Sequence, residues 1–336
     1  MLWGALFLVP PLFALGWFLR ERRLRATHAV GDGFQEEIEL PYSAEFELYH
    51  NALSLCSKKA RFCLDELGID YRGHHIDLIE TGRYENIGRD FLRVNPAGTV
   101  PVLVHRGHPI YESHEQIRYA AEHAPPGSPS LVPADAQARS EMDRWIDRSS
   151  LIGDDPIEDV DSSAGNAVPG LTVPLFAAMI ESIPVSRILE GLLFHRLKMR
   201  PLLFLAMKLG GLSRLSSGPA AEVVRRSGAA MGRHLDDLEA QLLTSGGPWI
   251  LGSEFTLADV SWAVVVERLR EADSIDVFLG AGRRPATTAW WGRIGERPAY
   301  RTAILESGSA TIEAGMARLR EAKAASPKLR TAIESF

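Results

Sequence analysis

A proline directly before an apolar run is the feature that most constrains how this chain can fold. Pro101 follows Val100 in the stretch NPAGTVPVLV and precedes three apolar residues. Proline cannot donate to a sheet ladder, so it suits the first position of a strand, and its peptide bond is a candidate for the rare cis form. A cis turn would leave the backbone N–H and C=O of Val100 free to pair with a bound peptide. The alternative is an ordinary trans turn proline.

The segments around this turn alternate between strand and helix patterns. In chain order, the predicted elements are a strand at 46–49, a helix at 57–67, a strand at 71–78, strands at 102–104 and 110–111, and a helix from Ser113. This order is strand–helix–strand followed by strand–strand–helix. It predicts a small α/β domain over residues 45–124.

Beyond a Pro-, Gly- and Ser-rich boundary at 124–133, the sequence predicts only helices. The expected division is an all-helical domain at 134–310, an insertion within it at about 152–217, and a charged helical tail at 311–336. Residues 192–212 of the insertion mix apolar and basic side chains. Two interpretations stay open: a helix on a membrane surface, or a core helix pair broken at Pro201.

The amino terminus predicts a membrane anchor. Residues 1–19 carry no charge, and a basic run follows at once. The apolar run is long enough to cross a hydrocarbon core, and basic residues after a span favour the cytoplasmic side. We therefore expect a single-pass transmembrane helix at 1–19, a basic flank and linker at 20–44, and the main domain on the cytoplasmic side. A cleaved secretory signal is the alternative.

Charge and cysteine content exclude several classes of function. The chain has 37 basic and 43 acidic residues and a net charge of −6, so no positive field indicates nucleic acid. The two cysteines, Cys56 and Cys63, form neither a disulfide framework nor a metal-ligand cluster. We expect no metal cofactor.

The turn before the first helix reads SLCS, from Ser54 to Ser57, with Cys56 between the serines. Serines at both outer positions remove the dithiol chemistry of a C-x-x-C motif, yet the start of a helix can still stabilise an anion. Ser54 is either a hydrogen-bond donor to such an anion or a plain helix cap.

These elements resemble the soluble glutathione transferase superfamily over about residues 46–304. LYHNALSLCSKKARFCL is similar to the zeta and theta serine enzymes, and the long insertion is similar to the membrane-anchored ganglioside-induced differentiation-associated protein group. The implied fold is a thioredoxin-like α/β domain followed by a helical transferase domain. The implied function is a membrane-anchored enzyme that activates the glutathione thiol and transfers it to a small hydrophobic electrophile by conjugation, thiolytic cleavage or isomerisation. The alternative is a non-catalytic glutathione-binding or scaffold protein.

The resemblance also implies roles for single residues. Ser54 would be catalytic through a hydrogen bond to the glutathione sulfur, with Cys56 and Ser57 as accessory groups. Val100 and Pro101 would hold the cysteinyl part of glutathione, and the γ-glutamyl part would lie at Glu112 and Ser113. Glutathione is the expected co-substrate, and a homodimer is possible. As an alternative, Ser113 and Gln116 form a capping box that needs no ligand.

Three further expectations concern structure. The cations Lys58, Lys59 and Arg61 are expected mostly on the solvated surface, and the alternative is that one of them binds a glycine carboxylate. The stretch FTLADV predicts a capped helix in which Thr256 and Asp259 are reciprocal partners. Cys63 and Trp145 are expected in the core.

Overall fold

The computed structural model describes residues 2–153, 155–195 and 198–336. Its sheet has five strands in the order β1-β5-β4-β2-β3. These are β1 Gly33–Phe34, β2 Phe46–His50, β3 Arg72–His75, β4 Val102–His105 and β5 His108–Tyr111. The helical segments of this domain are α2 Leu55–Leu67, η1 Ile79–Thr81, η2 Glu85–Ile87, α3 Arg89–Val94 and α4 Ser113–Glu122. The predicted thioredoxin-like order is confirmed.

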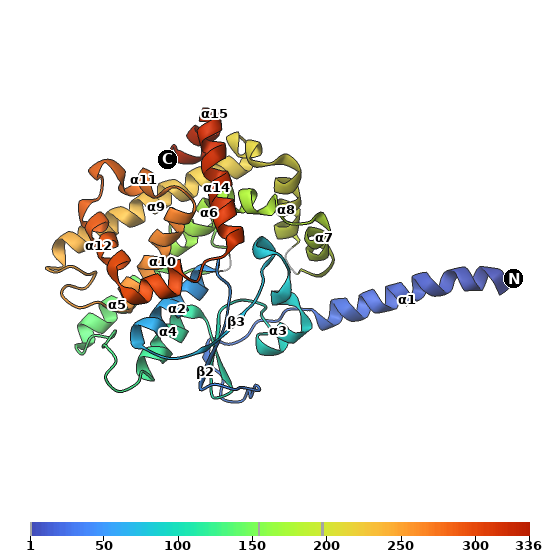
Figure 1. Cartoon of the computed structure of the whole chain (residues 1–336), viewed down its shortest axis with the longest axis horizontal. Coiled ribbons are helices and arrows are strands. Elements are labelled where there is room, and N and C mark those ends of the chain that lie inside the picture. The colour runs from blue at the N-terminus through green and yellow to red at the C-terminus, as the bar shows by residue number, and fades with distance from the viewer. Residues whose placement is uncertain (1, 154, 196–197) are drawn as a thin grey trace.

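The sheet forms because alternate apolar side chains of three central strands face one core. Leu48 of β2 pairs with Leu103 of β4, which pairs in turn with Ile110 of β5, and all three are at most 1% exposed. β2 is parallel to β3 and antiparallel to β4, as a strand–helix–strand crossover followed by a hairpin requires. Figure 1 shows α2 and α4 together beside this sheet.

The linker prediction for residues 20–44 differs from the structure. Gly33 and Phe34 pair with β5 as an added edge strand, and the Phe34 ring stacks on Tyr119 with 5.3 Å between centroids. A covered edge offers fewer free backbone groups to other chains. This part of the expected tether therefore belongs to the folded body.

The rest of the chain is helical, and its described residues contain no strand after β5. The helices are α5 Ala136–Ser149, α6 Ala164–Ile180, α7 Val185–Phe194, α8 Met199–Gly210, η3 Leu212–Ser216, α9 Pro219–Thr244, α10 Leu257–Glu271, α11 Ile275–Leu279, η4 Gly280–Gly282, α12 Pro285–Glu296, α13 Pro298–Tyr300, η5 Arg301–Leu305, α14 Ala310–Ala325 and α15 Pro327–Glu334. The helical second domain is thus confirmed, and the tail forms two helices.

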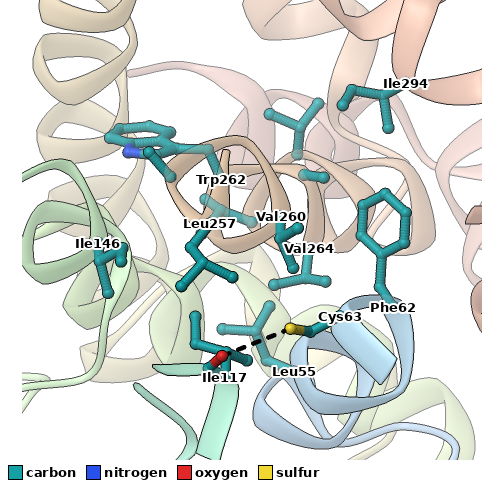
Figure 2. Packing of buried hydrophobic residues seen from close by; sticks show 14 of the residues in the cluster. Leu55, Phe62, Cys63, Ile117, Ile146, Leu257, Val260, Trp262, Val264 and Ile294 are labelled. Carbon is teal, nitrogen blue, oxygen red and sulfur yellow. Dashed lines mark hydrogen bonds between the residues drawn. The ribbon is translucent and has the colours of Figure 1, made fainter. Parts of the chain in front are cut away.

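One core joins the sheet domain to the helices. In Figure 2, Phe62 and Cys63 of α2 and Ile117 of α4 lie beside Leu257, Val260 and Val264 of α10. The predicted capping box at Thr256 and Asp259 starts α10, and Trp145 is buried, as is Cys63. Burial raises the pKa of the Cys63 thiol, so this thiol stays protonated. The two halves fold around a shared apolar interface.

The predicted membrane span is wrong. In the described part of the chain, no helix is both long and apolar enough to cross a membrane, so the predicted single-pass membrane location is also overturned. The apolar run continues into a charged segment of the same helix, α1 Leu2–Leu24, which projects from the body in Figure 1. Its end packs against the protein: Glu21 accepts from Arg89 Nε at 3.2 Å, and the Phe18 and Phe194 ring centroids are 5.8 Å apart.

The predicted insertion at about 152–217 holds the helices α6, α7 and α8 and the short η3. Helix α6 is almost wholly buried and packs along α9, while α7 and α8 form a hairpin on its far side. Within the predicted segment 192–212, residues 196 and 197 lie outside the described residues, and Pro201 lies inside α8 rather than at a break. The hairpin buries Phe204 and Met207 but exposes Leu193 and Leu209. The hairpin therefore has a buried and an exposed apolar face, and membrane contact of residues 192–212 stays a prediction.

Candidate active site

The turn at Ser54 places a half-buried hydroxyl at the start of α2. Ser54 is the N-cap residue, and its Oγ accepts from the Ser57 N–H at 3.2 Å. The same hydroxyl donates to the Val100 carbonyl at 3.4 Å, which is long for an O–H donor. The cap and donor interpretations are therefore compatible. The hydroxyl accepts the capping hydrogen bond with a lone pair, and the hydrogen bond that it donates is weak.

The two accessory candidates of this turn lie in different environments. Cys56 is half-buried and its thiol forms no disulfide. Ser57 is fully buried, and its Oγ accepts from the Asn51 N–H at 3.2 Å. Asn51 in turn fixes the loop through its side chain, which accepts from the Leu53 N–H at 2.9 Å. Cys56 is thus more exposed than Ser57, whose hydroxyl holds the loop from within.

The Val100–Pro101 bond is cis, as predicted. No described residue accepts a hydrogen bond from the Val100 N–H, so this donor is available to a ligand. The Pro101 carbonyl accepts from Gln116 Nε2 at 2.9 Å, and the same nitrogen donates to the Ile110 carbonyl at 2.9 Å. Gln116 therefore ties α4 to this turn.

Glu112 and Ser113 mark the junction between β5 and α4. Glu112 is the N-cap residue at φ 61°, a left-handed conformation that is uncommon for a residue other than glycine, and its side chain is exposed. Ser113 is buried, and its hydroxyl bonds to no other described residue. The capping-box alternative is wrong, because the Gln116 side chain reaches Pro101 instead of the helix start. The first N–H groups of α4 are left for an anion.

The expectation that three cations of α2 lie on the surface is also wrong. Lys58, Lys59 and Arg61 are each at most 2% exposed. Lys58 forms an ion pair with Glu271 of α10, whose carboxylate also lies 2.9 Å from Arg268 Nε. Burial raises the pKa of Glu271, but the two cations outweigh it and hold this pKa below its usual value. The helix was misjudged because the partners of these cations in the helical half lie 91 or more residues away in the sequence.

This ionic cluster of Lys58, Glu271 and Arg268 also holds the backbone next to Ser54 in place. Arg268 donates to the carbonyl of Leu53, the residue before Ser54, and also lies 3.4 Å from Thr172 Oγ1. Arg61 donates to the Asn51 carbonyl at 3.2 Å and contacts His50 Nδ1 at 3.1 Å. Burial and the nearby Arg61 lower the pKa of His50 to about 3, so this ring is neutral. His50 and Asn51 thus hold the loop.

Lys59 is buried on α2, five residues after Ser54. Its Nζ donates to Ser150 Oγ, after α5, at 3.1 Å. Burial lowers the pKa of Lys59, while the nearby Cys56 thiol and Glu112 oppose this shift. Burial is the main cause that lowers the pKa of His114, and the positive charge of Lys59 is the second. Lys59 therefore lies within electrostatic reach of both the α2 and the α4 helix starts.

The arrangement brings together a hydroxyl donor, a free backbone N–H and two helix starts. Such groups together favour an anionic, peptide-like ligand. Sequence reasoning named Ser54, Val100 and Ser113 but missed the supporting contacts of Gln116, Lys59 and Arg268. Lys58, Lys59 and Arg61 lie within four consecutive positions of α2, and no local pattern distinguishes Lys59 from a surface cation.

Two domain families match this chain. Residues 53–123 match the glutathione S-transferase N-terminal domain, and residues 221–292 match the glutathione S-transferase C-terminal domain. The chain belongs to the glutathione S-transferase superfamily. Both matched ranges lie within the α/β and helical halves described above.

Curated relatives of the glutathione S-transferase superfamily align with most of the chain. Glutathione S-transferase TCHQD of Arabidopsis thaliana is 27% identical over 264 residues, covering 77% of this chain and 89% of the relative. The 2,5-dichlorohydroquinone reductive dechlorinase of Sphingobium indicum is 26% identical over 308 residues, covering 80% of this chain and 84% of the relative. The prediction of an enzyme, a glutathione S-transferase, is confirmed.

Solved structures agree with this fold. The beta-etherase LigF from Sphingobium sp. strain SYK-6 superposes with a TM-score of 0.62 at 21% identity, over 78% of this chain and 100% of that one. A zeta-class maleyl pyruvate isomerase superposes with a TM-score of 0.53 at 21% identity, over 79% of this chain and 99% of that one. At this identity the likeness concerns the fold alone.

Proposed function

We propose that this glutathione S-transferase binds glutathione between the Ser54 turn, the Val100–Pro101 turn and the start of α4, and lowers the pKa of its thiol. The observation that carries this proposal is the Ser54 hydroxyl, whose proton is held only by a 3.4 Å contact with Val100. That proton is free to turn toward a sulfur anion at the start of α2. In the proposed complex, Val100 and Pro101 hold the cysteinyl part, and Glu112 and Ser113 hold the γ-glutamyl part.

The reaction we propose is transfer of the thiolate to a hydrophobic electrophile. The sulfur forms a bond to an electrophilic carbon, and the leaving group departs with its bonding electron pair. Curated relatives named as reductive dehalogenases of chlorinated hydroquinones favour an aromatic electrophile. Conjugation, thiolytic cleavage and isomerisation all need the same activated thiol. The zeta- or theta-type subgroup and the homodimer stay predictions.

Binding and turnover test the two halves of this proposal separately. Saturating glutathione is expected to raise the melting temperature of the full chain, since a ligand at about 100 times its Kd adds ~2.7 kcal/mol. Aromatic halides, epoxides, β-aryl ethers and maleyl compounds are then assayed for turnover. Binding without turnover of any class would favour the alternative, a non-catalytic glutathione-binding or scaffold protein. No thermal shift would refute both.

Replacing Ser54 separates a catalytic role from a structural one. Ser54→Ala removes the donor, and we expect kcat/KM to fall by about 10²-fold, as for other single donors to a developing anion. Glutathione affinity should change much less. Ser54→Thr is the matched variant that keeps both the hydroxyl and the cap. An alanine variant that loses affinity and keeps kcat would assign the hydroxyl to the cap alone.

A further inference from the structure

The buried ammonium of Lys59 has no charged partner of its own. Lys59 is 1% exposed, and its single hydrogen bond among the described residues goes to the neutral hydroxyl of Ser150. No described carboxylate lies within ion-pair distance of it, in contrast to Lys58 one position earlier, which pairs with Glu271. An ammonium carries three donors, so two remain unused. A buried, uncompensated charge is costly and calls for a functional reason.

The position of Lys59 suggests which anion it serves. Cys56 and Lys59 are three residues apart on α2 and therefore share a helix face. The charged and titratable groups that face Lys59 come from three elements and are Cys56 of α2, Glu112, His114 and Arg118 at α4, and Asp147 of α5. Arg118 already bonds to Asp143 at 3.0 Å and to Glu115 at 2.9 Å. Lys59 is thus the cation of this group without an ion pair.

We propose that Lys59 is the buried counter-charge of the glutathione thiolate. On this view, which rests on the proposed glutathione site, the Ser54 hydroxyl contacts the sulfur and Lys59 acts on it through space. The S–H proton leaves to solvent, and the negative charge that remains is stabilised by the ammonium through a low-dielectric interior. Thiolate and ammonium each favour the charged form of the other. Lys59 is therefore an electrostatic positioning residue, and it need not touch the substrate.

The decisive measurement is the pH titration of bound glutathione, followed by the ultraviolet absorbance of its thiolate. In Lys59→Met, we expect the half-titration point of the thiol to rise by about one pH unit, a tenfold loss of thiolate at neutral pH. kcat/KM at neutral pH should fall about tenfold and recover at higher pH, while glutathione affinity changes by less than about threefold. Lys59→Arg keeps the charge and is expected to restore the titration.

Two further variants exclude a merely structural role. Ser150→Ala removes the hydrogen-bond partner but keeps the charge, so the thiol should titrate as in the parent enzyme. Lys59→Gln keeps a donor toward Ser150 without the charge, so it should behave as Lys59→Met. Removing a buried unpaired charge should not lower the melting temperature, because replacing buried ionic groups by well-packed apolar ones is often neutral or stabilising.

Each outcome bears on a different claim. The role of Lys59 would be overturned if the thiol titration were unchanged in both Lys59→Met and Lys59→Gln. It would also be overturned if Ser150→Ala reproduced the shift. Neither result would contradict the proposed glutathione site. If glutathione with the parent enzyme titrates no lower than free glutathione, the proposed function itself fails. A shift in both neutral variants that Arg reverses establishes Lys59 as the counter-charge.

Discussion

At the scale of single residues, three neighbours on α2 perform different tasks. Ser54 donates only a long hydrogen bond. Lys58 joins the two halves of the protein through its ion pair with Glu271. Lys59 is buried without an ion pair to any described carboxylate. Because the three residues lie within six consecutive positions of one turn and helix, a local sequence pattern shows that they are polar but not which way they face. The neighbouring His50 is also held neutral by burial and Arg61.

His50 makes stability depend on pH. Its pKa is about 3 in the folded protein against an ordinary value of 6.5, so the unfolded chain binds the proton first as pH falls. The contribution is complete above pH 6.5 and is lost as the pH falls toward 3. Between pH 7 and pH 5 this residue alone should lower the unfolding free energy by about 2 kcal/mol.

Urea unfolding of the parent and His50→Gln at both pH values measures this contribution. The variant should lose about that much of the pH dependence, whatever its absolute stability. Equal pH dependence in the two proteins would show that His50 is protonated or exposed in the fold.

At the scale of elements, α2 and α10 are joined by buried charges beneath the Ser54 turn. Glu271 of α10 accepts from Lys58 and faces Arg268, and Arg268 holds the Leu53 carbonyl. A carboxylate shared by two buried cations fixes the angle between these helices as well as their contact. The start of α2 is therefore positioned by the helical half of the protein.

Glu271→Gln is expected to lower the unfolding free energy by about 3 kcal/mol, because it leaves two buried cations without a counter-charge. It should also raise KM for glutathione by loosening the Leu53 carbonyl. Denaturant unfolding and steady-state kinetics measure these effects. Glu222→Gln is the control, since its pair with Arg225 is exposed and should contribute less than about 1 kcal/mol. Similar losses in both variants would contradict the buried-cluster account.

At the scale of the whole molecule, the inserted helices and the end of the amino-terminal helix both contact the segment of the sheet domain from η1 to α3. Arg25, just after α1, donates to the Ile87 carbonyl at 2.9 Å and to Glu190 of α7 at 2.8 Å. Arg200 of α8 pairs with the buried Glu80 of η1. The segment from η1 to α3 is thus enclosed between additions at two distant places in the chain.

This enclosure depends on a glycine in α7. A Cβ at Gly191 would lie 2.3 Å from the Tyr84 hydroxyl oxygen, so Gly191→Ala should push the α7–α8 hairpin away from η2. We expect a loss of about 1 to 3 kcal/mol in unfolding free energy, as for other overpacked interiors. Gly292→Ala in α12, where nothing lies within 4 Å of the new Cβ, should instead be stabilising by up to about 1 kcal/mol. An unaffected Gly191→Ala variant would mean that the hairpin is not packed on Tyr84.

The sequence by itself determined the local order of elements, the proline before β4, the helix starts at Ser113 and Thr256, and the family, and it placed the start of α2 two residues too late. Each of these depends on spacing within a few residues, where periodicity, capping and turn chemistry act. The tertiary structure decided what α1 packs against, which face of the inserted hairpin is buried, and that Lys58 and Lys59 are interior. Burial and ion pairing come from contacts between segments far apart in the chain, so the charge of a side chain does not reveal where it lies.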